Sequence, residues 1–408
     1  MQRDFIPEIK QRGYFNNCTN IDSLNKLIEA GESITAYIGF DCTAKSLHVG
    51  SLSQIMLLRM LQKHGHKPII LMGGGTTKIG DPSGKDEARK IISEQDIAEN
   101  KASMAKVFSK FIQFGEGKTD AIMVDNSEWL DEIKYLEFLQ KYGRHFSINR
   151  MLTFDSVKLR LEREQNLSFL EFNYMLLQAY DFVELYKRYG CRLQLGGSDQ
   201  WGNIVNGTDL GRRMGTPELF GLTTNLITTS AGTKMGKTAQ GAVWLNEDML
   251  SPYDYWQFWR NTDDQDVIRF LKMFTELDAS QIENYAKLQG QELNEAKIAL
   301  ANAATIMCHG KEAAMAAEKT AIEAFVLGKN SEGLPEVAAS PTELIFKIMV
   351  AGGMAESGGA AKRLLKSNAV KIDDQPVTNE MACLQDVTSN KEVKISVGKK
   401  KHYLIKIK

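Results

Sequence analysis

The sequence predicts an α/β protein with a doubly wound parallel sheet in its first half, then an α-helical region, then a small α+β domain. Short β-rich runs alternate with helical periodicity in residues 1–225, which is typical of a parallel sheet covered by helices. Beyond Ser251 the sequence becomes helical and rich in alanine. Residues 342–408 begin with helical periodicity and end in a β-rich run.

The elements of the first half follow one another in a regular order. The apolar run from Ile34 to Ile38 predicts a strand, and residues 51–65 repeat apolar residues at helical spacing and stop at Gly65. Further strands are expected in "KPIILM", "DAIMVDN" and "CRLQLGG". A helix is expected in "FLEFNYMLLQAYDF".

Four of these strands end in polar or glycine-rich sequence. The strand ends read "GFDCTA", "GGGTTKIGDPSGK", "DNSEW" and "GGSDQWGN". In doubly wound sheets, ligands bind beyond the carboxyl ends of the strands. Several glycines there allow the backbone to approach a nucleotide or phosphate closely, so we expect the functional site at this edge.

The composition restricts the class of protein. A chain of 408 residues, 43% of them hydrophobic and 25% charged, is expected to form two or three globular domains. No run approaches the ~18 apolar residues that a membrane span needs, and no secretory leader is expected. The five cysteines are scattered without a C-x-x-C pair, so we expect neither disulfides nor a zinc site, and a cytoplasmic location.

The charge is unevenly distributed. Residues 342–408 carry 12 Lys and Arg against 7 Asp and Glu, a net charge of +5, whereas the whole chain has a net charge of −1. A basic end on a mildly acidic body indicates a polyanion partner. A solvated charged face explains the same numbers equally well.

The segment "HVGS" places His48 and Gly50 between a predicted strand and a predicted helix. A helix N-terminus has unpaired backbone N–H groups and partial positive charge, so it favours an anion. Gly50 leaves room for a ligand on the backbone, and His48 adds a ring donor. We interpret the segment as a phosphate site; the alternative is a histidine that only packs.

The segment "AGTKMGKT" matches a loose phosphate-loop pattern. That pattern requires a helix directly after the Thr, but Thr238 is followed by "AQGAVWLN", which does not predict one. We therefore reject a phosphate-loop NTPase. What is left is a loop with two lysines, Lys234 and Lys237, suited to neutralising a polyphosphate leaving group.

Three polar residues share one face of the predicted helix in "FLEFNYMLLQAYDF". Tyr174, Gln178 and Asp181 are spaced at i, i+4 and i+7 among apolar neighbours. Buried polar groups are costly without hydrogen-bond partners. A ligand would supply these partners, and an internal hydrogen-bond network would do so as well.

Taken together, these motifs resemble one family. "HVGS" is similar to the HIGH motif and "KMGKT" to the KMSKS loop of class I aminoacyl-tRNA synthetases. With "YIGFDCTA", "GDPSGK", "YMLLQAYDF" and "CRLQLGGSDQWGN", they resemble the bacterial-type tyrosyl-tRNA synthetases over nearly the whole chain. The segment "GMAESGGAAKRLLKSNAVKIDDQPV" resembles a small RNA-binding domain shared with a ribosomal small-subunit protein.

The resemblance implies a tyrosine pocket. The phenol is bracketed by Tyr37 and Asp181, so that bound phenylalanine would leave a buried carboxylate without its partner. The ligand ammonium lies among Tyr174, Gln178 and Asp81. The implied tyrosine-binding residues are Tyr37, Asp81, Tyr174, Gln178, Asp181 and Gln194.

The resemblance also implies an ATP site, with Asp199 at the ribose hydroxyls and Gln200 bordering the ribose. Ser51 stands where the family has a second histidine, and Gly236 and Thr238 stand at the serines of the lysine loop. The implied ATP-binding residues are Gly39, Asp41, Thr43, His48, Gly50, Ser51, Gly197, Asp199, Gln200, Lys237 and Thr238.

The implied reaction is attack of the tyrosine carboxylate on the α-phosphate of ATP, followed by transfer of tyrosine to the terminal adenosine of tRNA. The carboxylate is ionised at neutral pH, so no general base is needed and catalysis consists of positioning and charge stabilisation. Mg²⁺ is expected to be held mainly by the phosphates, with no metal site of the protein's own. The implied catalytic residues are His48, Lys234, Lys237, Lys85 and Arg89.

The resemblance assigns a role to each predicted region. Residues 1–225 are a Rossmann-like catalytic domain with a dimer segment around 120–165, and 226–330 hold the lysine loop and an anticodon-side helical domain. Residues 331–341 are a linker and 342–408 the RNA-binding domain. The implied partners are L-tyrosine, ATP, the tRNA for tyrosine and a second copy of the chain, with no membrane.

Two other functions share these features. The tryptophan-specific sister synthetase has the same fold and nucleotide motifs, but Tyr37 with Asp181 favours a phenol over an indole. A synthetase-derived RNA-binding protein without activity is the other alternative, and the presence of His48, Lys234 and Lys237 argues against it.

Overall fold

The computed structural model describes residues 5–82, 92–238, 241–326, 334–398 and 401–408, with the side chains of 155–156, 237–238, 324–326 and 401 left out. The chain divides into two compact units. The first comprises residues 1–47 and 51–227, and the second comprises residues 48–50 and 228–408. Each unit is described by itself.

The first unit is built on a six-stranded sheet in the order β1-β6-β5-β2-β3-β4. All neighbouring strands are parallel except β1, which is antiparallel to β6. The doubly wound parallel sheet is therefore confirmed. The strands are β1 (Phe15–Cys18), β2 (Thr35–Phe40), β3 (Lys67–Met72), β4 (Ile122–Asp125), β5 (Leu193–Gly197) and β6 (Phe220–Thr224).

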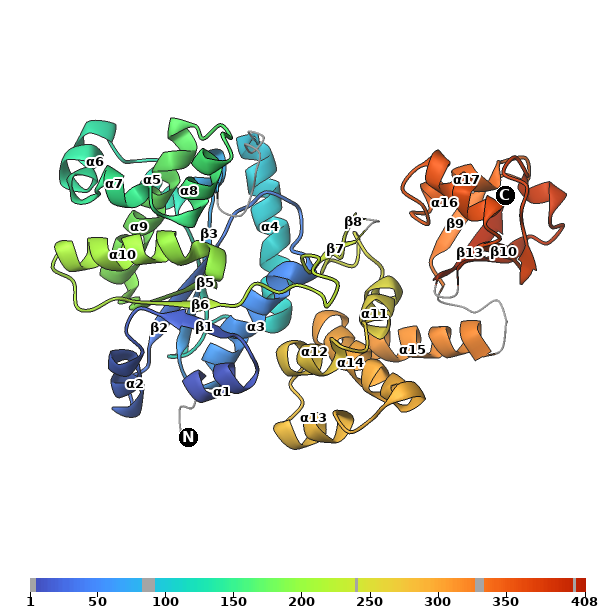
Figure 1. The fold of residues 1–408 in the computed structure, drawn as a ribbon, viewed down its shortest axis with the longest axis horizontal. Coiled ribbons are helices and arrows are strands. Elements are labelled where there is room, and N and C mark those ends of the chain that lie inside the picture. Colours follow the sequence, from blue (N-terminus) through green and yellow to red (C-terminus); the bar gives the residue numbers. More distant parts are fainter. Residues whose placement is uncertain (1–4, 83–91, 239–240, 327–333, 399–400) are drawn as a thin grey trace. The chain divides into compact units, whose positions relative to one another are not determined.

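Helices cover both faces of this sheet. Figure 1 shows α9 and α10 on one side of it and α3 and α4 on the other. The helices of this unit are α1 (Phe5–Gln11), α2 (Ile21–Glu29), α3 (Val49–Lys63), α4 (Glu94–Phe111), α5 (Ser127–Leu130), α6 (Tyr135–Lys141), α7 (Ile148–Met151), α8 (Asp155–Glu162), α9 (Phe169–Tyr189) and α10 (Trp201–Arg213).

Helix α9 carries the predicted polar stripe, and its ends are fixed by local sequence. The Ser168 side chain accepts from the backbone N–H of Glu171, whose carboxylate accepts from the N–H of Ser168 in return. Gly190 ends the helix at φ 65°, a left-handed conformation that glycine adopts at little cost. Between these signals the helix runs without a break past Tyr174, Gln178 and Asp181.

Two strands of this sheet were not among the predicted ones. Strand β6 reads "FGLTT" and is wholly buried, so it has no alternation of polar and apolar residues to reveal it. Strand β1 reads "FNNC", is largely exposed and pairs only with β6 at the edge of the sheet. Both strands owe their formation to their neighbours more than to their own sequence.

The second unit contains a group of helices built around aromatic side chains. Trp259 is fully buried and its ring lies 4.9 Å from that of Phe274 and 6.1 Å from that of Phe270. These helices are α11 (Pro252–Arg260), α12 (Val267–Phe274), α13 (Ala279–Tyr285), α14 (Leu293–His309) and α15 (Lys311–Val326), and a short hairpin of β7 (Lys237–Thr238) and β8 (Gly241–Ala242) precedes them.

The hairpin bears on the phosphate-loop pattern. Lys237 and Thr238 lie in β7, and Thr238 pairs with Gly241 in β8. The described residues after Thr238 therefore form a strand rather than the helix that a phosphate loop requires, in agreement with the rejection of that motif.

The end of the chain forms a five-stranded sheet in the order β11-β10-β12-β13-β9, with two helices. Strand β9 pairs in parallel with β13 and lies within the predicted linker 331–341, so that stretch is partly structural. It was missed because "EVAA" is short and has no alternation. The elements are β9 (Glu336–Ala339), α16 (Ile345–Ala351), α17 (Gly358–Lys366), β10 (Val370–Ile372), β11 (Gln375–Pro376), β12 (Glu392–Val397) and β13 (Lys401–Ile407).

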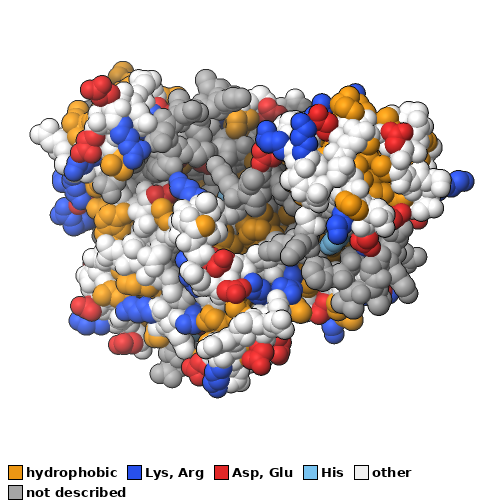
Figure 2. Space-filling view, turned by 45° about the vertical axis from the view of Figure 1, so that its right-hand side comes forward, with side chains coloured by type: hydrophobic (Ala, Val, Ile, Leu, Met, Phe, Trp, Pro, Cys, Tyr) orange, Lys and Arg blue, Asp and Glu red, His pale blue; other side chains and the backbone are white. Residues whose placement is uncertain are grey.

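Figure 2 shows Lys and Arg side chains interspersed with Asp and Glu over the visible face, rather than gathered in one field. In the part of the chain that the structure describes, no helix is long and apolar enough to cross a membrane.

Candidate active site

The order of strands defines where a ligand is expected. From β2 the chain adds β3 and then β4 on one side, whereas β5 and β6 lie on the other side. The order therefore reverses between β2 and β5, and open α/β sheets bind their ligands at such a point. Tyr37 of β2 and Gln194 of β5 are directly paired across it.

Tyr37 and Gln194 are buried polar residues with unsatisfied atoms. They are 1% and 2% exposed, and the Tyr37 hydroxyl and the Gln194 Oε1 have no hydrogen-bond partner among the described residues. Residues paired across parallel strands point to the same face of the sheet. Because buried polar atoms are nearly always hydrogen-bonded, two such atoms on one face indicate a site that a polar ligand completes.

Asp181, on helix α9, lies on the same side of the sheet as Tyr37 and Gln194. Its carboxylate accepts from the indole N–H of Trp129 at 2.7 Å and from the amide of Asn126 at 2.9 Å. Burial raises the pKa of Asp181 to about 7, although these two hydrogen bonds act in the opposite direction. The pKa of Tyr37 is raised by burial and by the neighbouring charge of Asp181.

Asn126 connects Asp181 to the loop after β3. Its Nδ2 also lies 3.1 Å from the hydroxyl of Thr76, and its Oδ1 accepts from the backbone N–H of Gly75 at 2.8 Å. Thr76 donates to Asp41 at 3.1 Å. One buried amide thus joins the ends of β3 and β4 to helix α9, which fixes the orientation of the Asp181 carboxylate.

Tyr174 and Gln178 find partners within the protein. The Tyr174 hydroxyl donates to Asp41 at 3.1 Å, and burial together with the charge of Asp41 raises its pKa. Gln178 Nε2 lies 3.3 Å from Gln200 Oε1, and Gln200 donates to Asp81 at 2.8 Å. Each residue of the polar stripe on α9 therefore belongs to a hydrogen-bonded network.

The network is rich in carboxylates. Asp41, Asp81 and Asp181 all lie close enough to Tyr174 for their charges to raise its pKa. A ligand that carries a positive charge on one end and a hydroxyl on the other matches this distribution. The apolar cluster around Tyr37, which includes Phe182 at a ring distance of 5.3 Å, supplies contact for the body of such a ligand.

The loop after β3 approaches these groups through its backbone. A Cβ on Gly73 would lie 2.7 Å from Asp41 Oδ1, and a Cβ on Gly74 would lie 2.3 Å from Asp125 Oδ1. The N–H of Gly74 donates to that same Asp125 oxygen at 3.1 Å. A side chain at either position would displace the carboxylate of Asp41 or Asp125, so these two glycines let both groups keep their arrangement.

The second unit brings the segments around His48 and Met235 together. The N–H of Val49 donates to the carbonyl of Val243 at 2.9 Å, and His48 forms a β-bridge with Trp244. A Cβ on Gly50 would lie 2.7 Å from the carbonyl oxygen of Met235. "HVGS" and "KMGKT" are almost 190 residues apart in the sequence and in contact in the structure.

The remaining predicted residues are placed as follows. Gly39 lies in β2, Thr43 follows β2 and is exposed, and Ser51 lies in the first turn of α3. Gly197 ends β5, and the exposed Asp199 belongs to the turn after it. Lys234 is exposed. Lys85 and Arg89 lie outside the described residues, and of Lys237 and Thr238 only the backbone is described.

Four residues of the network were missed by the sequence analysis: Thr76, Asn126, Trp129 and Asn203. Asn203 lies 3.0 Å from Gln178 and 3.1 Å from Gln200. All four lie in the polar strand ends "GGGTTKIGDPSGK", "DNSEW" and "GGSDQWGN". The strand ends were recognised, but which of their polar side chains point inward depends on the fold.

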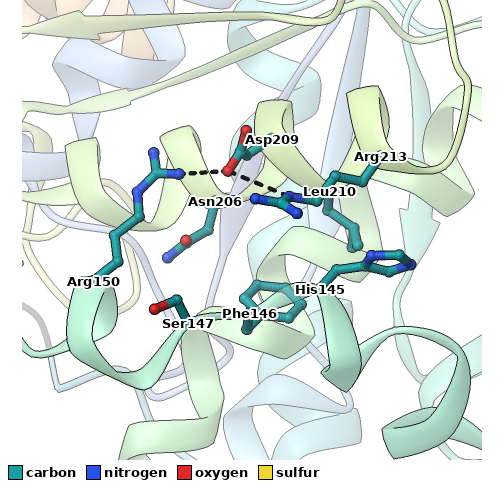
Figure 3. A pocket seen from close by; sticks show the side chains of 8 residues that line it. All are labelled: His145, Phe146, Ser147, Arg150, Asn206, Asp209, Leu210 and Arg213. Atoms are coloured by element: carbon teal, nitrogen blue, oxygen red, sulfur yellow. Dashed lines mark hydrogen bonds and ion pairs between the residues drawn. The ribbon is translucent and has the colours of Figure 1, made fainter.

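A hollow of the first unit lies between α10 and residues 145–150 (Figure 3). Asp209 is flanked there by the guanidinium groups of Arg150 and Arg213. The paired charges leave no free carboxylate for chemistry. Its lining residues are His145, Phe146, Ser147, Arg150, Asn206, Asp209, Leu210 and Arg213.

Comparison with known sequences identifies relatives of one family. A family model described as tRNA synthetases class I (W and Y) matches residues 29–326. A tyrosine–tRNA ligase of Methylocella silvestris is 57% identical over 99% of this chain and 98% of its own length. One from Rickettsia bellii is 54% identical over 99% of this chain and all of its own length.

Solved structures agree. A C-terminally truncated mitochondrial tyrosyl-tRNA synthetase of Aspergillus nidulans has 30% identity and a TM-score of 0.70, covering 79% of this chain and 94% of its own. A tryptophanyl-tRNA synthetase of Encephalitozoon cuniculi, 13% identical with a TM-score of 0.56 over 76% of this chain and 87% of its own, shares the fold alone.

Proposed function

The chain belongs to the class I tRNA synthetases of the tryptophan and tyrosine group, and we propose that Tyr37, Gln194 and Asp181 form its amino-acid pocket. The enzyme is an ATP-dependent aminoacyl-tRNA ligase. It activates L-tyrosine with ATP to tyrosyl-adenylate and pyrophosphate, and then transfers tyrosine to the terminal adenosine of its tRNA.

The phenol of tyrosine is held by Asp181. The single observation that carries this proposal is the buried carboxylate, fixed by Trp129 and Asn126, beside the unpartnered Tyr37 hydroxyl. The phenol of bound tyrosine donates its O–H to the Asp181 carboxylate and accepts a hydrogen bond from the Tyr37 hydroxyl. Phenylalanine would bury both groups without replacing their lost water, which costs free energy at each of them.

The ammonium of tyrosine lies at the other end of the network, among Asp81, Tyr174 and Gln178. Carboxylates near Tyr174 favour a cation there. Gln178 and Gln200 are already connected to Asp81, so a bound ammonium would replace or extend existing hydrogen bonds rather than create a site from disordered groups.

ATP is assigned to the glycine-rich strand ends and to the two nucleotide motifs. Gly39 lies near the end of β2, and Asp41 and Thr43 follow that strand. Gly197 is the last residue of β5, Asp199 and Gln200 follow it, and Ser51 lies on α3. His48 and Gly50, with the lysine loop of Lys234, Lys237 and Thr238, are assigned to the phosphates. Lys85 and Arg89 are further contacts of pyrophosphate.

The chemistry needs little from the protein beyond position and charge. The tyrosine carboxylate is ionised near neutral pH and attacks the α-phosphate directly. Lysine ammonium groups stabilise the charge that develops on the leaving pyrophosphate. Mg²⁺ is proposed to be held mainly by the phosphates of ATP, whose oxygens are the hard ligands that this ion prefers.

We assign tRNA binding to the basic C-terminal region and dimer formation to the segment around residues 120–165. Large apolar side chains are exposed in and next to that segment, and exposed apolar surface often marks an interface. These side chains are Tyr135, Leu136, Ile148, Leu152, Leu159, Leu161, Phe169 and Leu170. A cytoplasmic location is proposed because the chain is similar to bacterial tyrosine–tRNA ligases.

The proposal is tested by amino-acid-dependent exchange of pyrophosphate into ATP. The parent enzyme is expected to exchange with tyrosine and not with tryptophan or phenylalanine. Asp181→Ala is expected to lose the preference for tyrosine over phenylalanine, whereas the control Asp209→Ala, which removes a carboxylate paired with Arg150, should retain it. Near-normal discrimination in Asp181→Ala would remove the pocket assignment.

A further inference from the structure

The segment that carries Lys234 begins with a tight hairpin. The N–H of Gly232 donates to the carbonyl of Thr229 at 2.8 Å, and the N–H of Thr229 donates to the carbonyl of Thr233 at 2.8 Å. Gly232 has a φ of 76°, and Thr228 forms a β-bridge with Lys234. A glycine with a positive φ closes this tight turn and fixes which residues of the two arms face each other. Lys234 therefore occupies a defined position opposite Thr228.

The outgoing arm of this hairpin, residues 228–230, is held by two charged residues, one directly before α12 and one within it. Asp266 accepts from the backbone N–H of Ser230 at 2.7 Å, at the tip of the turn. Arg269 donates to the carbonyl of Thr228, at the base of the hairpin. The two side chains are also paired with each other at 2.6 Å.

The carboxylate of this pair is buried, whereas the Arg269 side chain is 42% exposed. The Asp266 side chain is only 5% exposed, and both of its oxygens are hydrogen-bonded. Hydrogen bonds to ionised groups are stronger than neutral ones, and a buried carboxylate is costly unless its partners are present. The hairpin supplies one of those partners through Ser230.

The returning arm is attached at a different place. Met235 is 4% exposed, and a Cβ on Gly236, whose φ is 88°, would lie 2.6 Å from the backbone nitrogen of Gly50. The N–H of Val243 donates to the carbonyl of Gly236 at 3.0 Å. Lys234 therefore lies between two attachments, one to Asp266 and Arg269 and the other to the start of α3.

We propose that Asp266 and Arg269 are positioning residues for Lys234. They fix the outgoing arm of the hairpin, so that the loop is already ordered. The Lys234 ammonium is thereby held near the "HVGS" segment. This inference rests on the proposed role of Lys234 in stabilising the pyrophosphate. It adds that two residues outside both nucleotide motifs control that role.

A positioning role and a purely structural role predict different kinetics. If Asp266 acts through Lys234, Asp266→Ala lowers the rate of tyrosyl-adenylate formation by roughly 10- to 100-fold, as expected for a misplaced catalytic group. The dissociation constant of tyrosine stays within about twofold, because the tyrosine pocket is unaltered. If Asp266 had only a structural role, Asp266→Ala would instead lower the melting temperature, slow adenylate formation and weaken tyrosine binding.

The decisive experiment is a double-mutant cycle on the full-length enzyme. Asp266→Ala, Lys234→Ala and the double variant are compared in single-turnover adenylate formation, with tyrosine binding and melting temperature measured for each. The double variant is expected to be no slower than Lys234→Ala alone. Losses that multiply in the double variant, or no loss in Asp266→Ala, would overturn the proposal.

Three controls separate the possible causes of failure. Asp278→Ala removes a capping carboxylate from neighbouring helix α13 and should leave the rate unchanged. If Lys234→Ala itself is without effect, the proposed role of the lysine fails and this inference with it. If Asp266→Ala does not fold, Asp266→Asn takes its place, because it retains an acceptor for Ser230 but loses the ionic partner of Arg269. It must then slow adenylate formation relative to the parent enzyme, and this loss must vanish in the Lys234→Ala background. A loss that multiplies with that of Lys234→Ala would overturn the proposal.

Discussion

Replacing Trp129 by Phe tests whether the proposed tyrosine pocket depends on an ionised Asp181 carboxylate. The change removes one donor, the indole N–H that lies 2.7 Å from Asp181, and keeps an aromatic ring at a position that is 3% exposed. The hydrogen bond from Trp129 favours the ionised carboxylate, which burial disfavours. Without it, Asp181 holds its proton to higher pH.

The size of the effect follows from the pKa of Asp181, which is about 7 in the parent enzyme. A hydrogen bond to a charged group contributes about 1.5–3 kcal/mol, so its loss raises the pKa of Asp181 to roughly 8–9. At about pH 7.5 the ionised fraction then falls from roughly three quarters to roughly 3–25%, and tyrosine affinity falls by roughly 3- to 25-fold.

The assay is equilibrium binding of tyrosine as a function of pH. In the parent enzyme, affinity is expected to decline as the pH falls through 7, since the protonated carboxyl no longer accepts from the phenol. In Trp129→Phe the same decline is expected at higher pH, with affinity recovering near the upper end of the range. A loss of equal size at every pH would indicate damaged packing, and would refute the argument.

Three further predictions concern other parts of the chain. Lys237→Ala should slow adenylate formation far more than it weakens tyrosine binding, and equal losses in both would contradict a transition-state role. Removing residues 334–408 should spare tyrosine-dependent exchange and weaken tRNA charging, and the contribution of this region should shrink as salt rises; unchanged charging would make its positive charge incidental. Glu8 accepts from His64 and Arg12, which lowers its pKa from 4.5 to about 2, so Glu8→Gln should reduce the melting temperature at neutral pH. Because a lowered pKa stabilises only above the unfolded value, that difference should shrink as the pH falls from 4.5 toward 2, and a constant difference would contradict the ion-pair account.

Much of the first unit could be predicted because its signals are local. Strands β2 to β5 are apolar runs followed by glycine or polar residues, and α9 is marked by a capping box at Ser168 and by Gly190. Strands β1, β6 and β9 could not be predicted in this way. They are short and lack alternation, and they form because neighbouring strands offer them backbone partners.

The candidate site shows the same division. Tyr174, Gln178 and Asp181 could be placed on one face because helical spacing alone decides it. The sequence left open whether a ligand or the protein satisfies them, and the structure gives each a protein partner. Trp129 and Asn126 could not be recognised as the donors to Asp181. These contacts join residues more than 50 positions apart in the sequence, and the sequence does not reveal which polar side chains of a strand end face α9.

The measurement that tests the central claim most directly is a crystal structure of the full-length enzyme with L-tyrosine bound. The account predicts the phenolic oxygen within hydrogen-bond distance of the Asp181 carboxylate, about 2.5–3.0 Å, and beside the Tyr37 hydroxyl. A tyrosine ring bound elsewhere, with Asp181 still held only by Trp129 and Asn126, would contradict it.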